Sequence, residues 1–252
     1  MDGVEASGIR GQETGIRGQE TGVRGQETGI RGQETGVRGQ ETAGLPNESS
    51  LVLEQAAELL RAGELLRAGE LVAFPTDTVY GVGALAWNRE AVGKLYIAKL
   101  RSLDKAIPIL LADPTDVDQV ARDVSPAVRR LAQRFWPGPL TIVVPRSAQV
   151  PDEVTSGGDS VAVRVPDHPL ARALIREAGA PLATTSANLS GGPSPVIAHE
   201  VSAQLAGRVA MILDGGRCPG GVASTVVDLT GSSPVILRPG PISLEEILEA
   251  VL

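Results

Sequence analysis

From Leu71 onward the sequence alternates short apolar runs with segments of helical periodicity, and this alternation restricts the chain to an α/β fold. Several of the runs are bounded by Pro, Gly or hydroxyl residues, as strands are. The strands expected are 71–74, 107–111, 139–144, 160–165, 181–185, 209–213, 224–229 and 234–237. Because the helical segments fall irregularly between these runs, we expect a mixed β-sheet with surrounding helices rather than a regular parallel repeat.

Capping residues indicate where the helices between these strands begin and end. Asn88 can cap a helix that places Val92, Leu95, Tyr96 and Lys99 at helical spacing. Further helices are expected at Ser125-Pro126, with Val128, Leu131, Ala132 and Phe135 on one face, from Asp167 to Gly179, and after a Ser243–Glu246 capping box.

Residues 8–42 repeat the heptapeptide GIRGQET or GVRGQET. Each unit has one Ile or Val where a coiled-coil seam needs two apolar positions, and its two Gly residues oppose a helix. We therefore expect residues 1–48 to be a disordered tail and residues 49–252 to form the folded domain. A second duplication, ELLRAG at 58–63 and 64–69, extends a helix whose apolar positions include Leu53, Ala56, Ala57 and Leu60.

Composition excludes several classes of protein. The net charge of −7 and the two residues each of Trp, Tyr and Phe argue against a basic nucleic-acid binder and a base-stacking platform. The single Cys218 excludes an internal disulfide, and one Cys with two His argues against a zinc site. No apolar run approaches the length of a membrane span, so the expected location is the cytoplasm, with no membrane partner.

The stretch FPTDTVYGVG at 74–83 leaves a strand through a polar turn. Its glycines formally match a loose dinucleotide-binding fingerprint, with Asp104 about twenty residues on. We reject that interpretation because the PTDT turn separates the glycines from the strand and Asp104 lies among basic residues. Two interpretations stay open here: a plain polar turn, or a rim of hydroxyls beside a pocket.

Cations gather between residues 94 and 105, and a lone Arg164 interrupts a later apolar strand. Lys99, Arg101 and Lys105 suit either a solvated helix end or a polyphosphate site, and no P-loop competes for that role. Alternation places Arg164 on one face with Ser160 and Ala162, where it needs an anionic partner, either a neighbouring Asp or a carboxylate ligand. Hydroxyl- and Gly-rich loops such as ATTSANLSGG at 183–192 add polar groups that suit a small-molecule site.

Taken in order, PTDTVYG, K-x-R (99–101), WPGPLT, VRVPD, S-x-N (186–188), STVVD and LRPG resemble the YrdC family, and within it the synthases of threonylcarbamoyl-AMP. The likeness spans residues 51–252 and leaves out the N-terminal repeat. It implies a twisted mixed β-sheet with surrounding helices and a concave, positively charged cavity. The chain ends where short family members end, so no extra C-terminal domain is expected.

The resemblance also implies an activity: L-threonine, bicarbonate and ATP, with Mg²⁺, would give L-threonylcarbamoyl-adenylate and pyrophosphate. Partner proteins would transfer the threonylcarbamoyl group to the tRNA adenosine beside the anticodon, and a weak direct contact with tRNA is compatible with this. Two alternatives stay open. One is a non-catalytic module that binds double-stranded RNA or tRNA; the other is a relative that adenylates a different carbamate, as in hydrogenase-maturation carbamoyltransferases.

The resemblance assigns site residues motif by motif. The L-threonine pocket would be lined by Thr78, Leu110, Arg164, Thr184 and Ser224. ATP would be bound by Arg101, Lys105, Ser160, Ser186, Asn188, Ser194 and Arg238, with Lys99 and Arg101 as the catalytic pair. Leu100 stands within K-x-R where many members carry Gly, and its bulk could alter the approach of this loop to phosphate.

Overall fold

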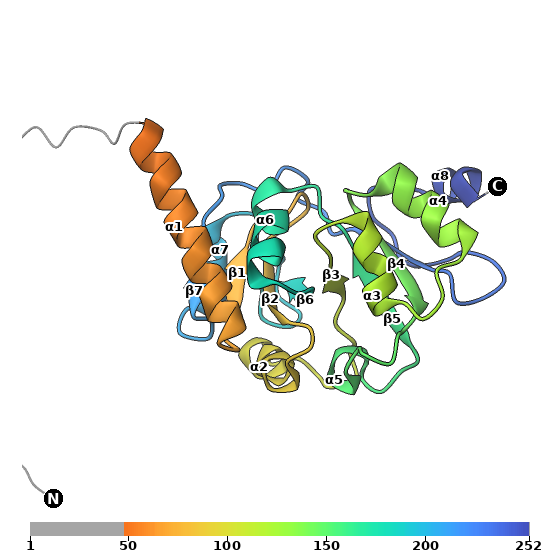
Figure 1. The fold of residues 1–252 in the computed structure, drawn as a ribbon, viewed down its shortest axis with the longest axis horizontal. Helices are drawn as coiled ribbons and strands as arrows, with labels where there is room; N and C mark the ends of the chain where they lie inside the picture. The colour runs from red at the N-terminus through yellow and green to blue at the C-terminus, as the bar shows by residue number, and fades with distance from the viewer. Residues whose placement is uncertain (1–47, 252) are drawn as a thin grey trace, which may run out of the picture. The chain divides into compact units, whose positions relative to one another are not determined.

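The computed structural model describes residues 48–251, so the disordered tail expected for residues 1–48 lies almost wholly outside the described residues. Within the described part of the chain, strands from its whole length join one nine-stranded sheet in the order β7-β1-β2-β6-β3-β5-β4-β8-β9 (Figure 1). The strands are β1 (Val72–Phe74), β2 (Gly81–Leu85), β3 (Ile109–Leu110), β4 (Leu140–Pro145), β5 (Ser160–Arg164), β6 (Leu182–Ser186), β7 (Met211–Ile212), β8 (Thr225–Asp228) and β9 (Val235–Arg238).

Strand pairing is mixed, as the irregular spacing of helices predicted. The pairs β1–β7, β3–β5 and β4–β8 are parallel, and the other neighbours are antiparallel. Central strands are thereby drawn from distant parts of the sequence: β6 lies between β2 and β3, and β5 lies between β3 and β4. Loops that follow these strands can therefore meet over the middle of the sheet.

Helices connect and cover the strands. They are α1 (Glu48–Arg67), α2 (Arg89–Lys99), α3 (Val117–Val120), α4 (Pro126–Phe135), α5 (Asp152–Thr155), α6 (Pro169–Ala178), α7 (Ala198–Leu205) and α8 (Leu244–Val251), with a 3₁₀ turn at Pro114–Asp116. None of the helices in the described region has the length and apolar character needed to cross a membrane.

The capping predictions are confirmed for α2, α4 and α8 and for the end of α6, but α6 begins at Pro169, where proline suits the first helical position, and not at Asp167. Asn88 and Ser125 accept hydrogen bonds from backbone N–H groups in the first turns of α2 and α4. Gly179 ends α6 with φ of 78°, the left-handed conformation that favours glycine. Ser243 and Glu246 form the expected reciprocal capping box before α8.

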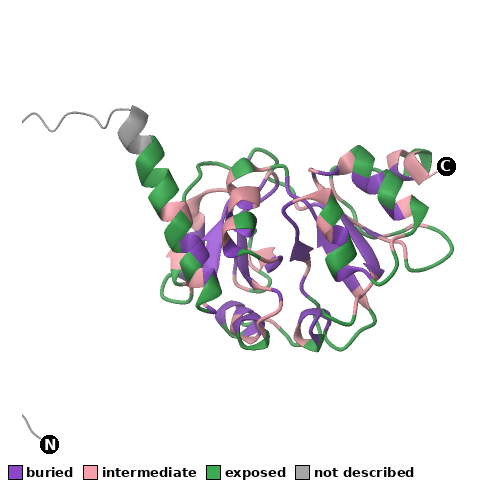
Figure 2. Ribbon diagram, in the orientation of Figure 1, coloured by how far each residue is buried: buried purple, intermediate pink, exposed green. Residues whose placement is uncertain are grey.

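Two layers of apolar side chains pack on opposite faces of the sheet. In β1, Val72 and Phe74 pack with α1 and α6, whereas the intervening Ala73 belongs to the larger core that includes α2, α4 and α8. This alternation explains why the short strand is buried throughout, as Figure 2 shows in purple.

Two sequence predictions are wrong in this region. Residues 81–85, where no strand was expected, form strand β2 between β1 and β6. The apolar face assigned to α1 is also wrong, because Leu53 and Leu60 are exposed while Ala62 and Leu66 are fully buried. The burial comes from the last turns of α1, which pack with α6.

Candidate active site

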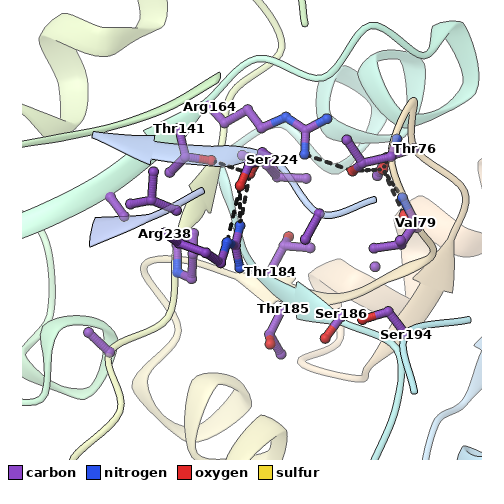
Figure 3. A pocket seen from close by; sticks show the side chains of 18 of the residues that line it. Thr76, Val79, Thr141, Arg164, Thr184, Thr185, Ser186, Ser194, Ser224 and Arg238 are labelled. Carbon is purple, nitrogen blue, oxygen red and sulfur yellow. Dashed lines mark hydrogen bonds between the residues drawn. The ribbon is translucent and has the colours of Figure 1, made fainter. Parts of the chain in front are cut away.

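A cavity of about 460 Å³ lies on one face of the central strands, a size typical of small-molecule sites (Figure 3). Alternation selects its lining: Thr141 and Val143 of β4 and Ser160, Ala162 and Arg164 of β5 line it. The residues between them, Ile142, Val161 and Val163, pack into the core on the other side of the sheet. The prediction that Ser160, Ala162 and Arg164 share a face is therefore confirmed.

The guanidinium of Arg164 is anchored by three protein groups. Its Nε donates to the carbonyl oxygen of Gly138 at 2.9 Å, Nη1 donates to Thr78 Oγ1 at 2.9 Å, and Nη2 pairs with the carboxylate of Asp77. An arginine has five N–H donors, so these contacts leave two that find no acceptor among the described residues. Those donors suit the bidentate binding of a carboxylate.

The sequence left open whether the anionic partner of Arg164 is a neighbouring Asp or a ligand, and the structure shows that Asp77 is one such partner. Burial lowers the pKa of Arg164, and the carboxylate of Asp77 opposes that shift by stabilising the charged guanidinium. Asp77 also accepts a hydrogen bond from the backbone N–H of Asp167 at 3.1 Å. The pair fixes the orientation of the Arg164 guanidinium and leaves two of its N–H donors for another acceptor.

The PTDT turn contributes hydroxyls to the cavity. Thr76 Oγ1 accepts hydrogen bonds from the N–H groups of Thr78 and Val79 at 3.1 and 3.3 Å, and donates to the carbonyl oxygen of Val79 at 2.7 Å. These bonds hold Thr78 beside Arg164, and both threonines line the cavity. Of the two interpretations of this stretch, the structure supports the rim of hydroxyls.

A second hydroxyl cluster surrounds Ser224, just before β8. Ser224 Oγ lies 2.7 Å from Thr141 Oγ1, and Arg238 Nη2 donates to both the carbonyl oxygen and Oγ of Ser224 at 2.8 and 3.0 Å. Burial lowers the pKa of Arg238. Figure 3 shows Arg238, Thr141 and Ser224 together at one side of the cavity.

The end of β6 supplies the hydroxyls of ATTSANLSGG. Thr184, Thr185 and Ser186 line the cavity, and Ser194 reaches it from the following loop. Thr184 faces β2 so closely that a Cβ on Gly83 would lie 3.0 Å from Thr184 Oγ1. The glycines of GVG therefore permit close approach of two strands. They lie within strand β2 and not in a turn between a strand and a helix, so the rejection of the dinucleotide fingerprint is confirmed.

Of the three cations between residues 99 and 105, the structure brings only Arg101 to the cavity, which Arg238 also lines. Its Nε and Nη2 donate to the carbonyl oxygens of Lys105 and Ala106 at 3.1 and 2.8 Å, and burial lowers its pKa. The side chain of Lys105 is exposed and does not line the cavity. Lys99 does not line the cavity either. It is buried, at 1% exposure, and donates to the backbone carbonyls of Ser186 and Asn188.

Comparison with known proteins decides the family. A family model for Sua5, YciO and YrdC proteins, described as "Telomere recombination", matches residues 64–240. The chain belongs to this family. The resemblance found in the sequence motifs is thereby confirmed, and so is the expected mixed-sheet fold.

Several Sua5/YciO/YrdC relatives are similar to this chain over most of its folded part. It is 47% identical to the threonylcarbamoyl-AMP synthase of Pyrococcus abyssi over 180 residues, which cover 71% of this chain and 53% of that protein. It is 48% identical to the Bacillus subtilis enzyme of the same name over 182 residues, covering 72% and 52%. The chain thus spans about half the length of these curated relatives.

Solved structures of the Sua5/YciO/YrdC family agree with this fold. P. abyssi Sua5 complexed with L-threonine superposes with a TM-score of 0.75 at 45% identity, covering 77% of this chain and 57% of that chain. E. coli YciO superposes with a TM-score of 0.70 at 25% identity, covering 77% and 93%.

The structure gathers most of the residues that the resemblance assigned. All of them line one cavity except Lys99, Lys105 and Asn188. Three further threonines line the cavity without having been assigned to a substrate: Thr76 and Thr185, which lie in the two hydroxyl-rich stretches, and Thr141, which the sequence analysis missed. Thr141 carried a usable signal, because it is a lone hydroxyl in an apolar strand, two residues from Val143 and thus on the same face.

Proposed function

We propose that this chain synthesises L-threonylcarbamoyl-adenylate from L-threonine, bicarbonate and ATP, releasing pyrophosphate. The observation that carries the proposal is one cavity with two kinds of polar lining. Arg164 and Thr78 lie at one part of it, whereas Thr185, Ser186 and Ser194 lie at another part, as seen in Figure 3 for the labelled residues. Two polar substrates could therefore meet there.

L-Threonine would bind at the Arg164 end. The two N–H groups of Arg164 that lack an acceptor among the described residues would hold the carboxylate, with Thr78, Thr184 and Ser224 supplying hydroxyls for the remaining polar groups. Leu110 lines the same cavity and offers an apolar contact for the methyl group. The complex of P. abyssi Sua5 with L-threonine supports the choice of L-threonine as the ligand.

ATP would occupy the remaining part of the cavity. Arg101 and Arg238 supply positive charge, and Ser160, Ser186 and Ser194 supply hydroxyls. Lys105 lies on the exposed loop next to Arg101, so its ammonium would reach a phosphate from the mouth of the cavity. Among described residues, no acidic side chain lines the cavity, which favours an anionic ligand.

The reaction needs positioning more than proton transfer by side chains. The threonine amine would attack bicarbonate to form a carbamate with loss of water, or attack CO₂ with loss of a proton. An oxygen of the carbamate would then attack the α-phosphorus while the bond to pyrophosphate breaks. Holding the two reactants in contact converts an encounter between molecules into a reaction within one complex. Arg101 and Arg238 would stabilise the negative charge that accumulates on the departing pyrophosphate.

Mg²⁺ would enter with the triphosphate. The described residues hold no cluster of three His, Cys, Asp or Glu side chains, and those lining the cavity offer hydroxyl oxygens but no carboxylate. Such a lining fits a metal carried by phosphate oxygens and water rather than by a protein cage. When bound, it would neutralise charge on the phosphates.

The product would be used in the cytoplasm by proteins that transfer the threonylcarbamoyl group to tRNA. This step is needed because a mixed carbamic–phosphoric anhydride is reactive and has to be consumed by a second reaction. Direct contact with tRNA would be weak at most, because the whole chain carries a net charge of −7.

The test is pyrophosphate release by the purified full-length chain with ATP and Mg²⁺. The proposal predicts release that requires L-threonine and bicarbonate together, with omission of either one reducing the rate to background. Release that is independent of L-threonine or of bicarbonate would contradict it. Replacement of L-threonine by other amino acids would then show whether a different carbamate is the substrate.

A further inference from the structure

Lys99 is a buried cation whose contacts all lie on one turn. Its Nζ donates to the backbone carbonyl oxygens of Ser186 and Asn188, and Asn188 Oδ1 lies 3.5 Å away. Within residues 48–251 the ammonium forms no ion pair with a carboxylate. Three oxygens around one ammonium use all three of its donors, so the charge is bound to the protein and not offered to the cavity.

The same turn orients Ser186. The amide nitrogen of Asn188 donates to the carbonyl oxygens of Leu189 and Gly192, each at 2.7 Å, which fixes the amide with Oδ1 toward Ser186. Ser186 Oγ donates its single hydrogen to that Oδ1. Its lone pairs are therefore left for the cavity, which Ser186 lines.

We propose that Lys99 is a positioning residue that fixes the 186–188 turn so that the Ser186 hydroxyl presents its lone pairs to a donor group of the nucleotide, a ribose hydroxyl or the adenine amino group. The inference rests on the proposed function. Each of the two motifs, K-x-R and S-x-N, then has one residue in the cavity lining and one outside it. Arg101 and Ser186 line the cavity, while Lys99 and Asn188 bind each other outside it. A backbone bond from Ser190 N–H to the Lys99 carbonyl, at 2.9 Å, joins the same two segments.

A double-mutant cycle on the dissociation constant for ATP, measured by calorimetry with Mg²⁺, tests this directly. Ser186→Ala and Lys99→Met should each weaken ATP binding about tenfold, since the first removes a hydrogen bond to the nucleotide and the second releases the turn that orients it. The double variant should bind ATP within about twofold of Ser186→Ala, because Lys99 acts through Ser186. Weakening by about a hundredfold in the double variant would mean independent contacts and would overturn the proposal.

Control variants separate positioning from loss of fold. Lys94→Met removes another lysine of α2, bound to Glu70 and the Gly69 carbonyl, and should leave ATP affinity unchanged. L-Threonine affinity should also stay unchanged in Lys99→Met. If that variant does not fold, Asn188→Ala, which removes the acceptor of the Ser186 hydroxyl, must show the same non-additivity with Ser186→Ala.

Proton binding supplies a second readout. Burial, reinforced by Arg101, lowers the pKa of Lys99 to about 8, so raising the pH above this value removes one donor from the turn. Wild-type ATP affinity should fall about threefold between pH 7 and 9.5, and Lys99→Met should show no such fall. Equal pH dependence in both proteins would contradict the proposal. Because the readout is binding, it is independent of whether L-threonine-dependent turnover occurs.

Discussion

Arg164, which lines the cavity, forms an ion pair with Asp77, and the two side chains are 7% and 11% exposed. Such a pair has lost most of its hydration, and each partner depends on the other for compensation. The arginine can therefore be both a structural residue and a ligand-binding residue, because the pair uses one part of its fork and leaves another part for a carboxylate.

Asp77→Asn should lower the free energy of unfolding by about 3 kcal/mol, because it leaves the buried charge of Arg164 without its partner. Denaturant unfolding measures this loss. The control is Asp118→Asn, which breaks an exposed pair with Arg129 and should cost no more than about 1 kcal/mol. Similar small losses in the two variants would mean that the buried pair contributes no more than a surface pair.

Arg164→Lys should raise the KM for L-threonine at least about tenfold, because an ammonium cannot reproduce the bidentate fork. The KM for ATP should change little, since Arg164 is bound to the PTDT turn rather than to the nucleotide end. Steady-state pyrophosphate release with each substrate varied in turn measures both constants. A larger effect on ATP than on L-threonine would place the amino acid elsewhere.

Leu100→Gly should raise the free energy of unfolding by about 0.5–1 kcal/mol. Leu100 ends α2 with φ of 53° and is 66% exposed, so glycine relieves the backbone without removing much packing. Thermal melting measures the change. Leu103→Gly is the matched control: this leucine is similarly exposed but has no positive φ, and its replacement should not stabilise the protein. A destabilised Leu100→Gly would show that the leucine itself makes a needed contact.

The stability difference between wild type and Lys99→Met should depend on pH. The pKa of Lys99 is about 8 in the folded chain and near 10.5 when the chain is unfolded, so the unfolded state binds more protons between these values. Wild-type stability should therefore rise relative to Lys99→Met from pH 8 to 10.5, by up to about 3 kcal/mol. A difference that stays constant over this range would mean that Lys99 does not carry a penalty for burying its charge.

Most of the sheet could be predicted from the sequence because its strands are apolar runs with clear ends. Strand β2 could not, since GVGAL has two glycines, which weaken strand propensity, and the reason for them lies in a distant residue. Gly83 is needed for the approach of Thr184, and the sequence around either residue gives no sign that the two positions pair. The prediction of the buried face of α1 was wrong for a similar reason, because the contact with α6 determines that Ala62 and Leu66 are buried.

The site could be predicted as a set of residues but not as an arrangement. Motif spacing brought together the hydroxyls and Arg164, because their strands alternate on one face. It could not separate Arg101, which lines the cavity, from Lys99, two residues earlier, which turns to the β6 end. That difference depends on the left-handed residue between them, which only the folded chain reveals.

The most direct test of the central claim is the identity of the product made from ¹³C-bicarbonate. We expect mass spectrometry to detect an adenylate that contains the threonine moiety, heavier by one mass unit than the product made from ordinary bicarbonate. Its formation should match pyrophosphate release in rate. Pyrophosphate release without a labelled adenylate containing threonine would contradict the account.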